Sequence, residues 1–285
     1  MSYRSVFRPG LFAGQTIVVT GAGSGIGRCT AHELASLGAH VVLVGRTPAK
    51  LEAVAGEIRE DGGAASHHAC DIRDEEAVRA TVGAVLAARG RIHGLVNNAG
   101  GQFPAERAGI SARGWQAVIA NNLTGGFLVA RECYTQCMRE HGGAIVNMLA
   151  DMWNGMPGMG HSGAARAGML NLTETAAAEW APVRVNAVAP GWIASSGMDT
   201  YPAAMQPLIQ SLPRHVPAQR LGTEAEVSAA IVFLLSEGAA FVSGACLRID
   251  GAAPNARRHW MMAAGTPSPE FDGFHRSRKP RVLGG

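Results

Sequence analysis

The sequence predicts an α/β fold, a single doubly wound domain with a seven-stranded parallel sheet and helices on both faces. Short apolar runs alternate with helical patterns along most of the 285 residues. Repeated strand–helix crossovers of this kind return each strand parallel to the one before it. A glycine-rich turn, Gly21–Gly27, also stands between the first apolar run and the first helical pattern. In such folds ligands bind beyond the carboxyl ends of the strands.

Each predicted strand is a short run rich in small and β-branched residues. The seven runs cover about 16–20, 40–45, 66–71, 92–100, 143–149, 183–191 and 245–251. Between them, apolar residues recur at helical spacing. The first two predicted helices end near residues 37 and 58. The later ones cover about 75–88, 112–141, 162–180 and 224–235.

The alternation has no linker rich in proline or serine before the end of the chain. We therefore expect an N-terminal arm (1–13), one dinucleotide-binding catalytic domain (14–252) and a C-terminal extension (253–285). With 47% hydrophobic and 16% charged residues, the chain can bury a substantial core. The five cysteines are scattered and odd in number, which predicts neither a disulfide framework nor a metal site.

Net charge and apolar runs limit the possible partners. The formal charge of +3 is small and dispersed, so we expect no nucleic acid partner. No apolar stretch reaches the length that spans a bilayer, and the first 15 residues lack the apolar centre of a signal peptide. We therefore expect a soluble cytoplasmic protein with no membrane partner.

The turn "TGAGSGIG" predicts a phosphate site of the Rossmann type. Gly21, Gly25 and Gly27 allow a tight turn and let backbone amides approach a pyrophosphate closely. The helix that follows adds a favourable dipole at its N-terminus. Ser24 and Ile26 lie within the same turn, and the Ser24 hydroxyl is a further donor. The alternative is a tight strand–helix turn with no ligand.

The end of the second strand predicts the choice of cofactor. A carboxylate there would accept hydrogen bonds from the ribose of NAD and repel a 2′-phosphate. This chain has Gly45, Arg46 and Thr47 instead, and a guanidinium suits a phosphate. The sequence therefore predicts NADP(H) over NAD(H). The alternative is that Arg46 is only a solvated surface residue.

The spacing T-G-x-x-x-G-I-G resembles the short-chain dehydrogenase/reductase family. Other family marks follow at the expected intervals: Asp71, "NNAG", "NLTG", "PGWIAS" and "SGACLRIDG". Together they span about residues 14–252. The predicted cofactor site comprises Gly21, Ser24, Gly25, Ile26, Gly27, Arg46, Asp71, Ile72, Asn98, Ala99, Gly100, Arg166, Pro190, Gly191, Ile193 and Ser195.

The resemblance implies that Asn, Ser, Tyr and Lys positions form the catalytic site. By spacing, the Asn is present as Asn122, whereas Leu149, Ser162 and Arg166 stand at the other three positions. A serine hydroxyl is a far weaker acid than a phenol, and arginine does not give up a proton. Arg166 still offers hydrogen bonds to a ribose and a positive charge near a developing anion. The alternative is that Ser162 only caps a helix and Arg166 only lies in its first turn.

The sequence segments around these substituted positions are similar to those of the peroxisomal trans-2-enoyl-CoA and 2,4-dienoyl-CoA reductases. "NNAGGQF", "NNLTG", "EHGGAIVN" and "HSGAARAGMLNLT" carry the resemblance. It implies NADPH-dependent reduction of a conjugated C=C bond in an acyl-CoA thioester, as in fatty acid metabolism. The tyrosines of those enzymes are absent here, with Leu170 and Met152 in their neighbourhoods. Tyr201 and Asp151 are therefore the candidate proton donors, and His161 is held in reserve as a base.

A second resemblance competes with the first. "LADMW" and "GMPGMGHSGAARAG" are similar to bacterial short-chain dehydrogenases linked to citronellol catabolism. That resemblance implies oxidation of an acyclic terpene alcohol or aldehyde, or saturation of a terpenoid acyl-CoA. The third possibility is a nucleotide-binding protein without turnover. For an enoyl thioester, the charge builds on the thioester oxygen, where Asn122, Ser162 and Arg166 would be donors.

Two further expectations concern assembly and the C-terminal tail. Family members pair the two long helices, about 112–141 and 162–180, between subunits, which implies a homotetramer or homodimer. The tail is strongly basic and either clasps the protein or attracts the phosphates of CoA. Its basic residues are Arg257, Arg258, Arg276, Arg278, Lys279 and Arg281, opposed by Glu270 and Asp272.

Overall fold

The computed structural model describes residues 2–256 and 266–285. Its seven strands form one parallel sheet in the order β3-β2-β1-β4-β5-β6-β7. The strands are β1 (Thr16–Thr20), β2 (His40–Gly45), β3 (Ala64–Ala69), β4 (Gly94–Asn97), β5 (Ala144–Met148), β6 (Arg184–Pro190) and β7 (Cys246–Ile249). The strand order reverses between β1 and β4, which opens a crevice at their carboxyl ends. The predicted doubly wound fold is confirmed.

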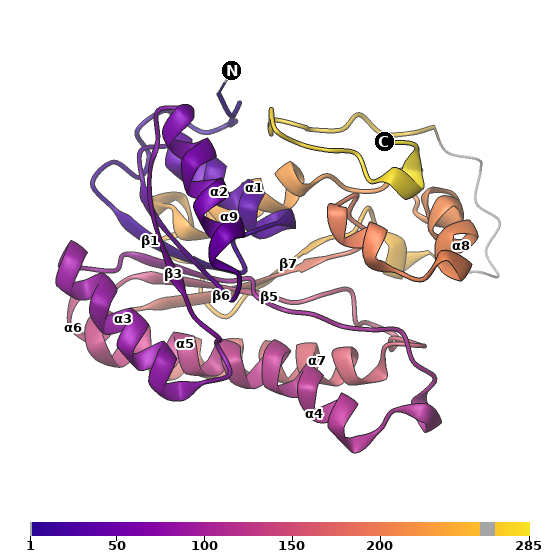
Figure 1. Ribbon diagram of the computed structural model, residues 1–285, viewed down its shortest axis with the longest axis horizontal. Coiled ribbons are helices and arrows are strands. Elements are labelled where there is room, and N and C mark those ends of the chain that lie inside the picture. The colour runs from indigo at the N-terminus through magenta and orange to yellow at the C-terminus, as the bar shows by residue number, and fades with distance from the viewer. Residues whose placement is uncertain (1, 257–265) are drawn as a thin grey trace.

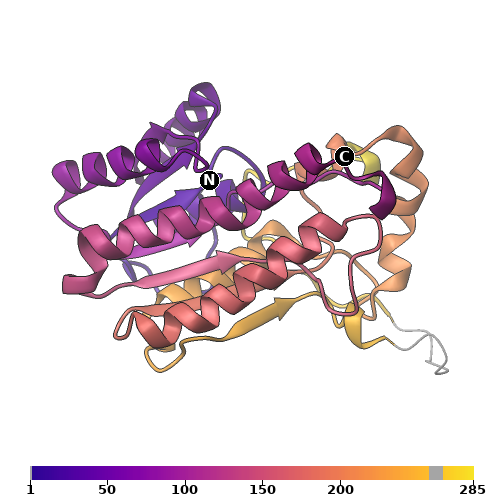
Figure 2. The ribbon, with the colours of Figure 1, turned by 90° about the horizontal axis from the view of Figure 1, so that it is seen from below.

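Helices cover both faces of the sheet (Figure 1). One layer holds α1 (Gly25–Ser36), α2 (Pro48–Glu60) and α9 (Glu224–Leu235). The other holds α3 (Glu75–Arg89), α4 (Ala112–Ile119), α5 (Gly125–Cys133), α6 (Arg139–His141) and α7 (Gly160–Glu179). Figure 2 shows this second layer from below, with its long helices running across the sheet. The central strands β1, β4 and β5 are buried along their whole length because both faces are covered.

Several element ends differ from the sequence prediction by one to three residues, and the strand predicted over 92–100 covers only Gly94–Asn97. The strand predicted over 66–71 begins two residues earlier and ends at Ala69, because it pairs residue by residue with β2 from His40–Ala64 to Gly45–Ala69. The long helix predicted over 112–141 is a continuous run, but it widens into π-helical turns at Ala120–Thr124 and Tyr134–Met138. Such single wide turns inside α-helices occur frequently at functional sites.

The chain between β6 and α9 forms a separate small layer beyond the carboxyl ends of the strands. It contains a 3₁₀ turn at Ser196–Thr200 and the short helix α8 (Gln206–Ser211). Residues 196–215 are called the covering segment below. Its buried residues Met198, Ile209 and Leu212 pack with Val282 from the C-terminal tail.

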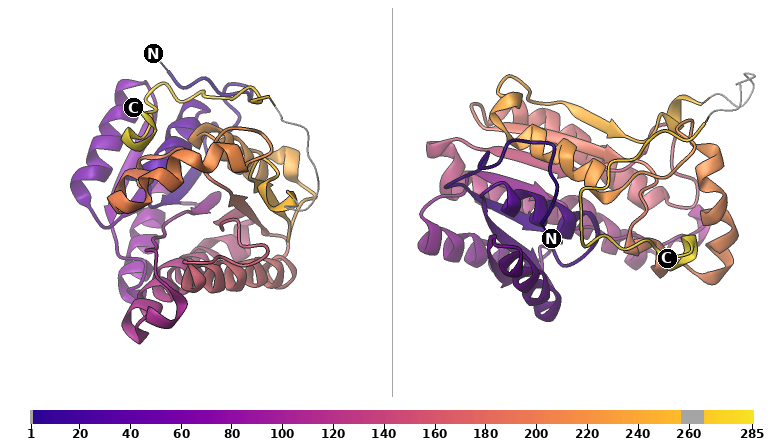
Figure 3. Two further views of the ribbon diagram at one scale, coloured as in Figure 1. Left: turned by 90° about the vertical axis from the view of Figure 1, so that its right-hand side faces the viewer. Right: turned by 90° about the horizontal axis from the view of Figure 1, so that it is seen from above.

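The N-terminal arm and the C-terminal tail both lie over the layer of α1, α2 and α9 (Figure 3). Phe274 is buried against Tyr3, Cys29 and Ala225. The Arg276 guanidinium pairs with Asp61 at the end of α2. Beyond this anchor, the tail returns to the covering segment. These contacts favour the clasping role over the role in attracting CoA phosphates.

The basic residues of the tail are divided between several environments. Arg276 is paired with carboxylates, and Arg281 donates its backbone N–H to Asp199 at 3.3 Å. Arg278 and Lys279 are exposed. Arg257 and Arg258 lie outside the described residues. Only Arg278 and Lys279 among the described members are therefore open to solvent without a carboxylate contact.

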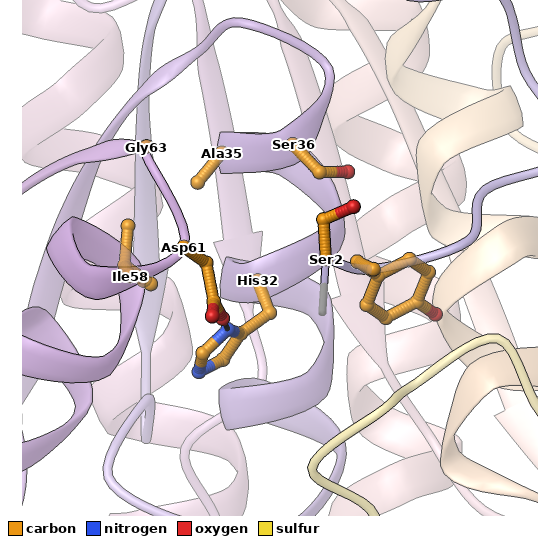
Figure 4. A pocket seen from close by; sticks show the side chains of 8 residues that line it. Ser2, His32, Ala35, Ser36, Ile58, Asp61 and Gly63 are labelled. Carbon is orange, nitrogen blue, oxygen red and sulfur yellow. Dashed lines mark ion pairs between the residues drawn. The ribbon is translucent and has the colours of Figure 1, made fainter.

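A small pocket lies beneath the N-terminal arm, near the carboxyl end of α1 (Figure 4). His32 and Asp61 face each other there, and His32 Nε2 also lies 3.1 Å from Glu57. Burial lowers the pKa of His32 to about 4. Its ring is therefore neutral at pH 7 and carries a single N–H, so it donates a hydrogen bond to only one of the two carboxylates. This pocket lies at the opposite end of α1 from the glycine turn, between the N-terminal arm and the domain.

Among the residues that the structure describes, no helix has both the length and the apolar character needed to cross a bilayer.

Candidate active site

The glycine turn follows β1 and leads into α1. Gly21 has φ +66°, and a Cβ there would lie 2.9 Å from the Cα of Ala99. A Cβ on Gly27 would lie 2.5 Å from the carbonyl oxygen of Gly21. Both positions therefore require glycine, because the turn packs directly on the loop after β4. Ser24 precedes α1, and its hydroxyl makes no capping hydrogen bond.

Asn98 shapes this turn from the other side. Its Nδ2 donates to the Thr20 carbonyl at 2.9 Å, and its backbone N–H donates to the Thr20 hydroxyl at 3.0 Å. The Asn98 side chain thus holds the turn in place, whereas Ala99 and Gly100 line the space in front of it. Of these three predicted cofactor residues, only the last two face that space.

An open cleft runs from the glycine turn to the end of β2. Arg46 and Lys50 line it together with Ser24, and neither cation pairs with a carboxylate among the described residues. Ile72 and Asn121 line its other side. The donors and cations at the β2 end fit a phosphorylated ribose, and the glycine turn fits a pyrophosphate. Lys50 was not predicted from the sequence.

Asp71 lies beside this cleft but its carboxylate is engaged. The Arg73 Nε donates to it at 2.9 Å. Hydrogen bonds from Arg73 hold the pKa of the Asp71 carboxyl well below its usual range, and the charge of Arg46 adds to this effect. Asp71 is therefore ionised, and its contact with a cofactor stays a prediction.

Asn122 lies in the first π-helical turn, close to the loop after β4. Its Oδ1 accepts a hydrogen bond from the Gly101 N–H at 2.8 Å. Its Nδ2 is buried and has no partner among the described residues. Since unpartnered buried donors are uncommon, this amide is free to bind a ligand or a water molecule.

Arg166 extends from α7 toward the same loop. Its Nη1 donates to the Met148 carbonyl at the end of β5 at 2.5 Å, and its Nε has no partner among the described residues. A Cβ on Gly100 would lie 2.5 Å from Nη2, so glycine leaves room for the guanidinium. Burial lowers the pKa of Arg166 to about 10, which still leaves it charged at pH 7. No carboxylate in the described part of the chain pairs with it.

Ser162 is also close to the loop after β4. Helix α7 begins at Gly160 and its N-cap is Met159, so Ser162 lies inside the first turn and does not cap the helix. Its hydroxyl donates to Gln102 Oε1 at 2.6 Å. Gln102 Nε2 in turn donates to the Tyr201 hydroxyl at 3.2 Å. The structure thus brings Ser162, Gln102 and Tyr201 into one chain of hydrogen bonds.

Asp151 and His161 have different surroundings. The Asp151 N–H donates to the Pro190 carbonyl at 2.9 Å, and burial, with the nearby charge of Asp250, raises the pKa of its carboxyl. These contacts place Asp151 near the ends of β6 and β7. His161 is fully buried with its ring edge-on to Phe103, and neither ring nitrogen has a partner in the described residues.

The predicted cofactor residues after β6 lie at the same edge of the sheet. Gly191 donates its N–H to the Ile249 carbonyl at 2.9 Å, and a Cβ there would lie 2.9 Å from Asp250. Ile193 forms a bridge with Gly222, and Ser195 is the N-cap residue that precedes the 3₁₀ turn of the covering segment. Pro190 ends β6. These four residues connect the sheet edge to the covering segment.

The fold and this edge of the sheet define a dinucleotide-dependent oxidoreductase, and comparison with known proteins gives its family. Residues 21–252 match the family model described as enoyl-(acyl carrier protein) reductase. The chain is 35% identical over 244 residues to a Bacillus subtilis protein assigned as a probable 2,4-dienoyl-CoA reductase, covering 83% of this chain and 95% of that one. The chain belongs to the short-chain dehydrogenase/reductase family, as the sequence motifs predicted.

Two solved structures add to this comparison. The citronellol catabolism dehydrogenase AtuB of Pseudomonas aeruginosa is 66% identical, with a TM-score of 0.80 over 88% of this chain and 100% of that one. A gluconate 5-dehydrogenase candidate from Beutenbergia cavernae, with NADP bound at low occupancy, is 34% identical, with a TM-score of 0.81 over 87% of this chain and 100% of that one. The chain is thus similar both to a probable dienoyl-CoA reductase and to a dehydrogenase of citronellol catabolism.

Proposed function

We propose that this protein uses NADP(H) to reduce a C=C bond conjugated to the thioester of an acyl-CoA. The observation that carries the proposal is the pair of buried, unpartnered donors on Arg166 and Asn122. We propose that they hold the thioester oxygen as the charge of an enolate develops, since no phenol occupies position 162. Donors fixed before the reaction are the usual means of stabilising such an oxyanion.

The chemistry of the two reactions explains why these residues favour reduction of a double bond. Reduction of a ketone places charge on the oxygen that must also receive the proton, so the loss of a strong acid there is costly. Reduction of an enoyl thioester sends the electrons to the thioester oxygen and delivers the proton to the α-carbon. Bound NADPH would supply the hydride at the β-carbon. The residues of this chain need only bind the oxygen anion and provide a proton at the α-carbon.

For the cofactor, we propose that Arg46, Lys50 and Ser24 hold the 2′-phosphate of NADP(H). The glycine turn would hold the pyrophosphate, and Arg166 and Asn122 would lie at the reactive end. We expect Arg46→Asp to weaken NADPH binding by at least about tenfold, because it removes one charge-assisted contact and adds a repulsive charge. NADH binding should change little. Fluorescence titration with both cofactors measures the ratio, and an unchanged ratio would show that Arg46 is only a surface residue.

For the acyl group, we propose a branched, acyclic terpenoid chain. The support is the similarity to a dehydrogenase of citronellol catabolism together with the similarity to a dienoyl-CoA reductase. Saturation of a terpenoid acyl-CoA would satisfy both. The second candidate is oxidation of a terpene alcohol, which the name of the first of these relatives favours. That reaction needs a base near neutral pH, and Asp151 and His161 are the candidates.

A substrate panel tests the proposal directly. We expect NADPH oxidation to be faster with 2-enoyl-CoA or 2,4-dienoyl-CoA thioesters than with 3-oxoacyl-CoA. Oxidation of citronellol with NADP⁺ should be slow. The loss of NADPH absorbance gives the rates, and mass spectrometry of the thioester identifies the product. If alcohols or ketones turn over fastest, the double-bond proposal fails, and NADPH binding without any turnover would indicate a binding protein.

We further propose a cytoplasmic homo-oligomer, a tetramer or a dimer. The support is an apolar depression on the outer face of α5 and α7, lined by Phe127, Leu172 and Trp180, with Phe127 itself partly exposed. A second copy of the same face would bury this surface.

A further inference from the structure

Gln102 joins the two hydroxyl groups of the candidate active site. It follows Gly101 in the loop after β4, between α7 and the covering segment. Its Oε1 accepts from Ser162 at 2.6 Å, and its Nε2 donates to Tyr201 at 3.2 Å. Tyr201 directly follows the 3₁₀ turn of the covering segment and is half-buried against the cluster that holds Met198.

We propose that Gln102 is a positioning residue that makes Tyr201 the proton donor to the substrate and keeps Ser162 from that role. The inference rests on the function proposed above and names the source of its second proton. It follows from the direction of the two hydrogen bonds. A carboxamide has one end that only accepts and one end that only donates, so it treats its two hydroxyl partners in opposite ways.

Ser162 has a single hydroxyl proton, and Gln102 Oε1 accepts it. Ser162 is fully buried, so it has no water to exchange that bond with. Its oxygen can still accept a hydrogen bond, but it offers no proton to a developing anion while this bond stands. The donors left for that anion would be Asn122 Nδ2 and Arg166 Nε, which have no partner in the described residues.

The hydrogen bond between Gln102 and Tyr201 runs in the opposite direction. Gln102 Nε2 donates to its oxygen and leaves the phenol proton free to turn toward a substrate. The same N–H stabilises the negative charge on that oxygen after the proton has left. Among the described tyrosines, Tyr3 is buried beneath Phe274 and Tyr134 is stacked on Trp180, so both are committed to packing.

Bound NADPH would supply hydride at the β-carbon, and the two electrons of the C=C bond would move toward the thioester oxygen, giving an enolate. As the enolate collapses, the Tyr201 O–H bond breaks and a C–H bond forms at the α-carbon. The phenolate then takes a proton from water. The sum is enoyl thioester, NADPH and one proton giving saturated thioester and NADP⁺.

Four variants test this assignment, with kcat measured on the fastest substrate of the panel. Tyr201→Phe should lower kcat by about a hundredfold or more, as expected for loss of a general acid. Gln102→Glu should lower it by a comparable factor, because a carboxylate only accepts and captures the Tyr201 proton. The double variant should be no slower than Tyr201→Phe alone. Gln206→Glu makes the same chemical change at an exposed position of the covering segment and should keep the wild-type kcat.

A second measurement does not depend on turnover. Gln102→Leu removes the link between the loop after β4 and the covering segment, so hydrogen exchange of amides 198–205 should become faster. Gln102→Glu retains a hydrogen bond to Tyr201 and should leave that exchange close to wild type. The two variants thus separate the order of the segment from the placement of the proton.

The proposal is overturned if Tyr201→Phe keeps the wild-type kcat, or if Gln102→Glu behaves like Gln206→Glu. It is also overturned if Ser162→Ala lowers kcat a hundredfold while Tyr201→Phe does not, since the amide would then be oriented the other way. Failure of the proposed function is a different result, a panel in which no unsaturated thioester is reduced. In that case the hydrogen-exchange comparison of Gln102→Leu with Gln102→Glu still tests the link between Gln102 and Tyr201.

Discussion

Replacing Arg166 with methionine is expected to lower kcat by about a hundredfold or more. The free energy of unfolding should stay within about 1 kcal/mol of the wild-type value or rise above it. Arg166 is only 8% exposed, and within the described part of the chain its guanidinium makes one hydrogen bond, to the Met148 carbonyl. Burying a charge without a counter-ion costs free energy of folding, so its removal offsets the lost hydrogen bond. In the reaction, the same unneutralised charge stabilises the oxygen anion.

Arg166→Lys separates charge from shape. Lysine keeps a positive charge. It lacks the planar guanidinium, in which one nitrogen binds the Met148 carbonyl while Nε remains available for a ligand, so we expect partial activity. Turnover is measured on the fastest thioester, and urea unfolding gives the free energy of unfolding. A variant that loses stability in proportion to its activity would point to a structural role for Arg166 instead.

The fold could be predicted from the sequence because its signals are local. The run "TIVVT", the glycine turn and the helix after it lie within 21 residues, 16–36, and each reports its own structure. Tertiary pairing then adjusts the ends of the elements. The bounds of β3 follow its partner β2, which is why the strand predicted over 66–71 moved by two residues.

The candidate active site could be predicted only in part. Asn122, Ser162 and Arg166 came from the spacing of family motifs, and the structure brings all three to the loop after β4. Gln102 was missed because its contacts lie 60 and 99 residues away along the chain, beyond the reach of any local pattern. A signal was nevertheless present, since a polar side chain directly after "NNAGG" stands at the carboxyl end of β4.

Lys50 and the tail illustrate the same limit. Lys50 stands one turn beyond Arg46 in the chain, and only the angle of α2 brings it to the cleft. In the tail, the basic residues suggested a role in binding phosphate. Nothing in "FDGFHR" indicated that Phe274 would fill a gap between α1 and the N-terminal arm, because that gap exists only after both ends of the chain have packed.

Replacing Phe274 with alanine is therefore expected to release the tail. Phe274 is 2% exposed, its ring centre lies 5.7 Å from that of Tyr3, and the Arg28 guanidinium lies 5.0 Å above it. Removing a buried phenylalanine side chain costs about 3–5 kcal/mol. The tail can undock by itself, so the loss is limited to the docking free energy of this segment. Urea unfolding should therefore show a loss of global unfolding free energy smaller than about 3–5 kcal/mol. Limited proteolysis should cleave the tail of the variant much faster than that of the wild type.

Release of the tail should also reach the covering segment. Val282 packs on Met198 and Ile209, and the Val282 N–H donates to Asp199 at 3.2 Å. Without the Phe274 anchor these contacts become weaker, so we expect KM for the acyl-CoA to rise severalfold and NADPH affinity to change little. Phe241→Ala is the matched control, because Phe241 is fully exposed and its removal should change the free energy of unfolding by no more than about 0.5 kcal/mol. If both variants keep the wild-type KM, the tail does not order the segment that carries Tyr201.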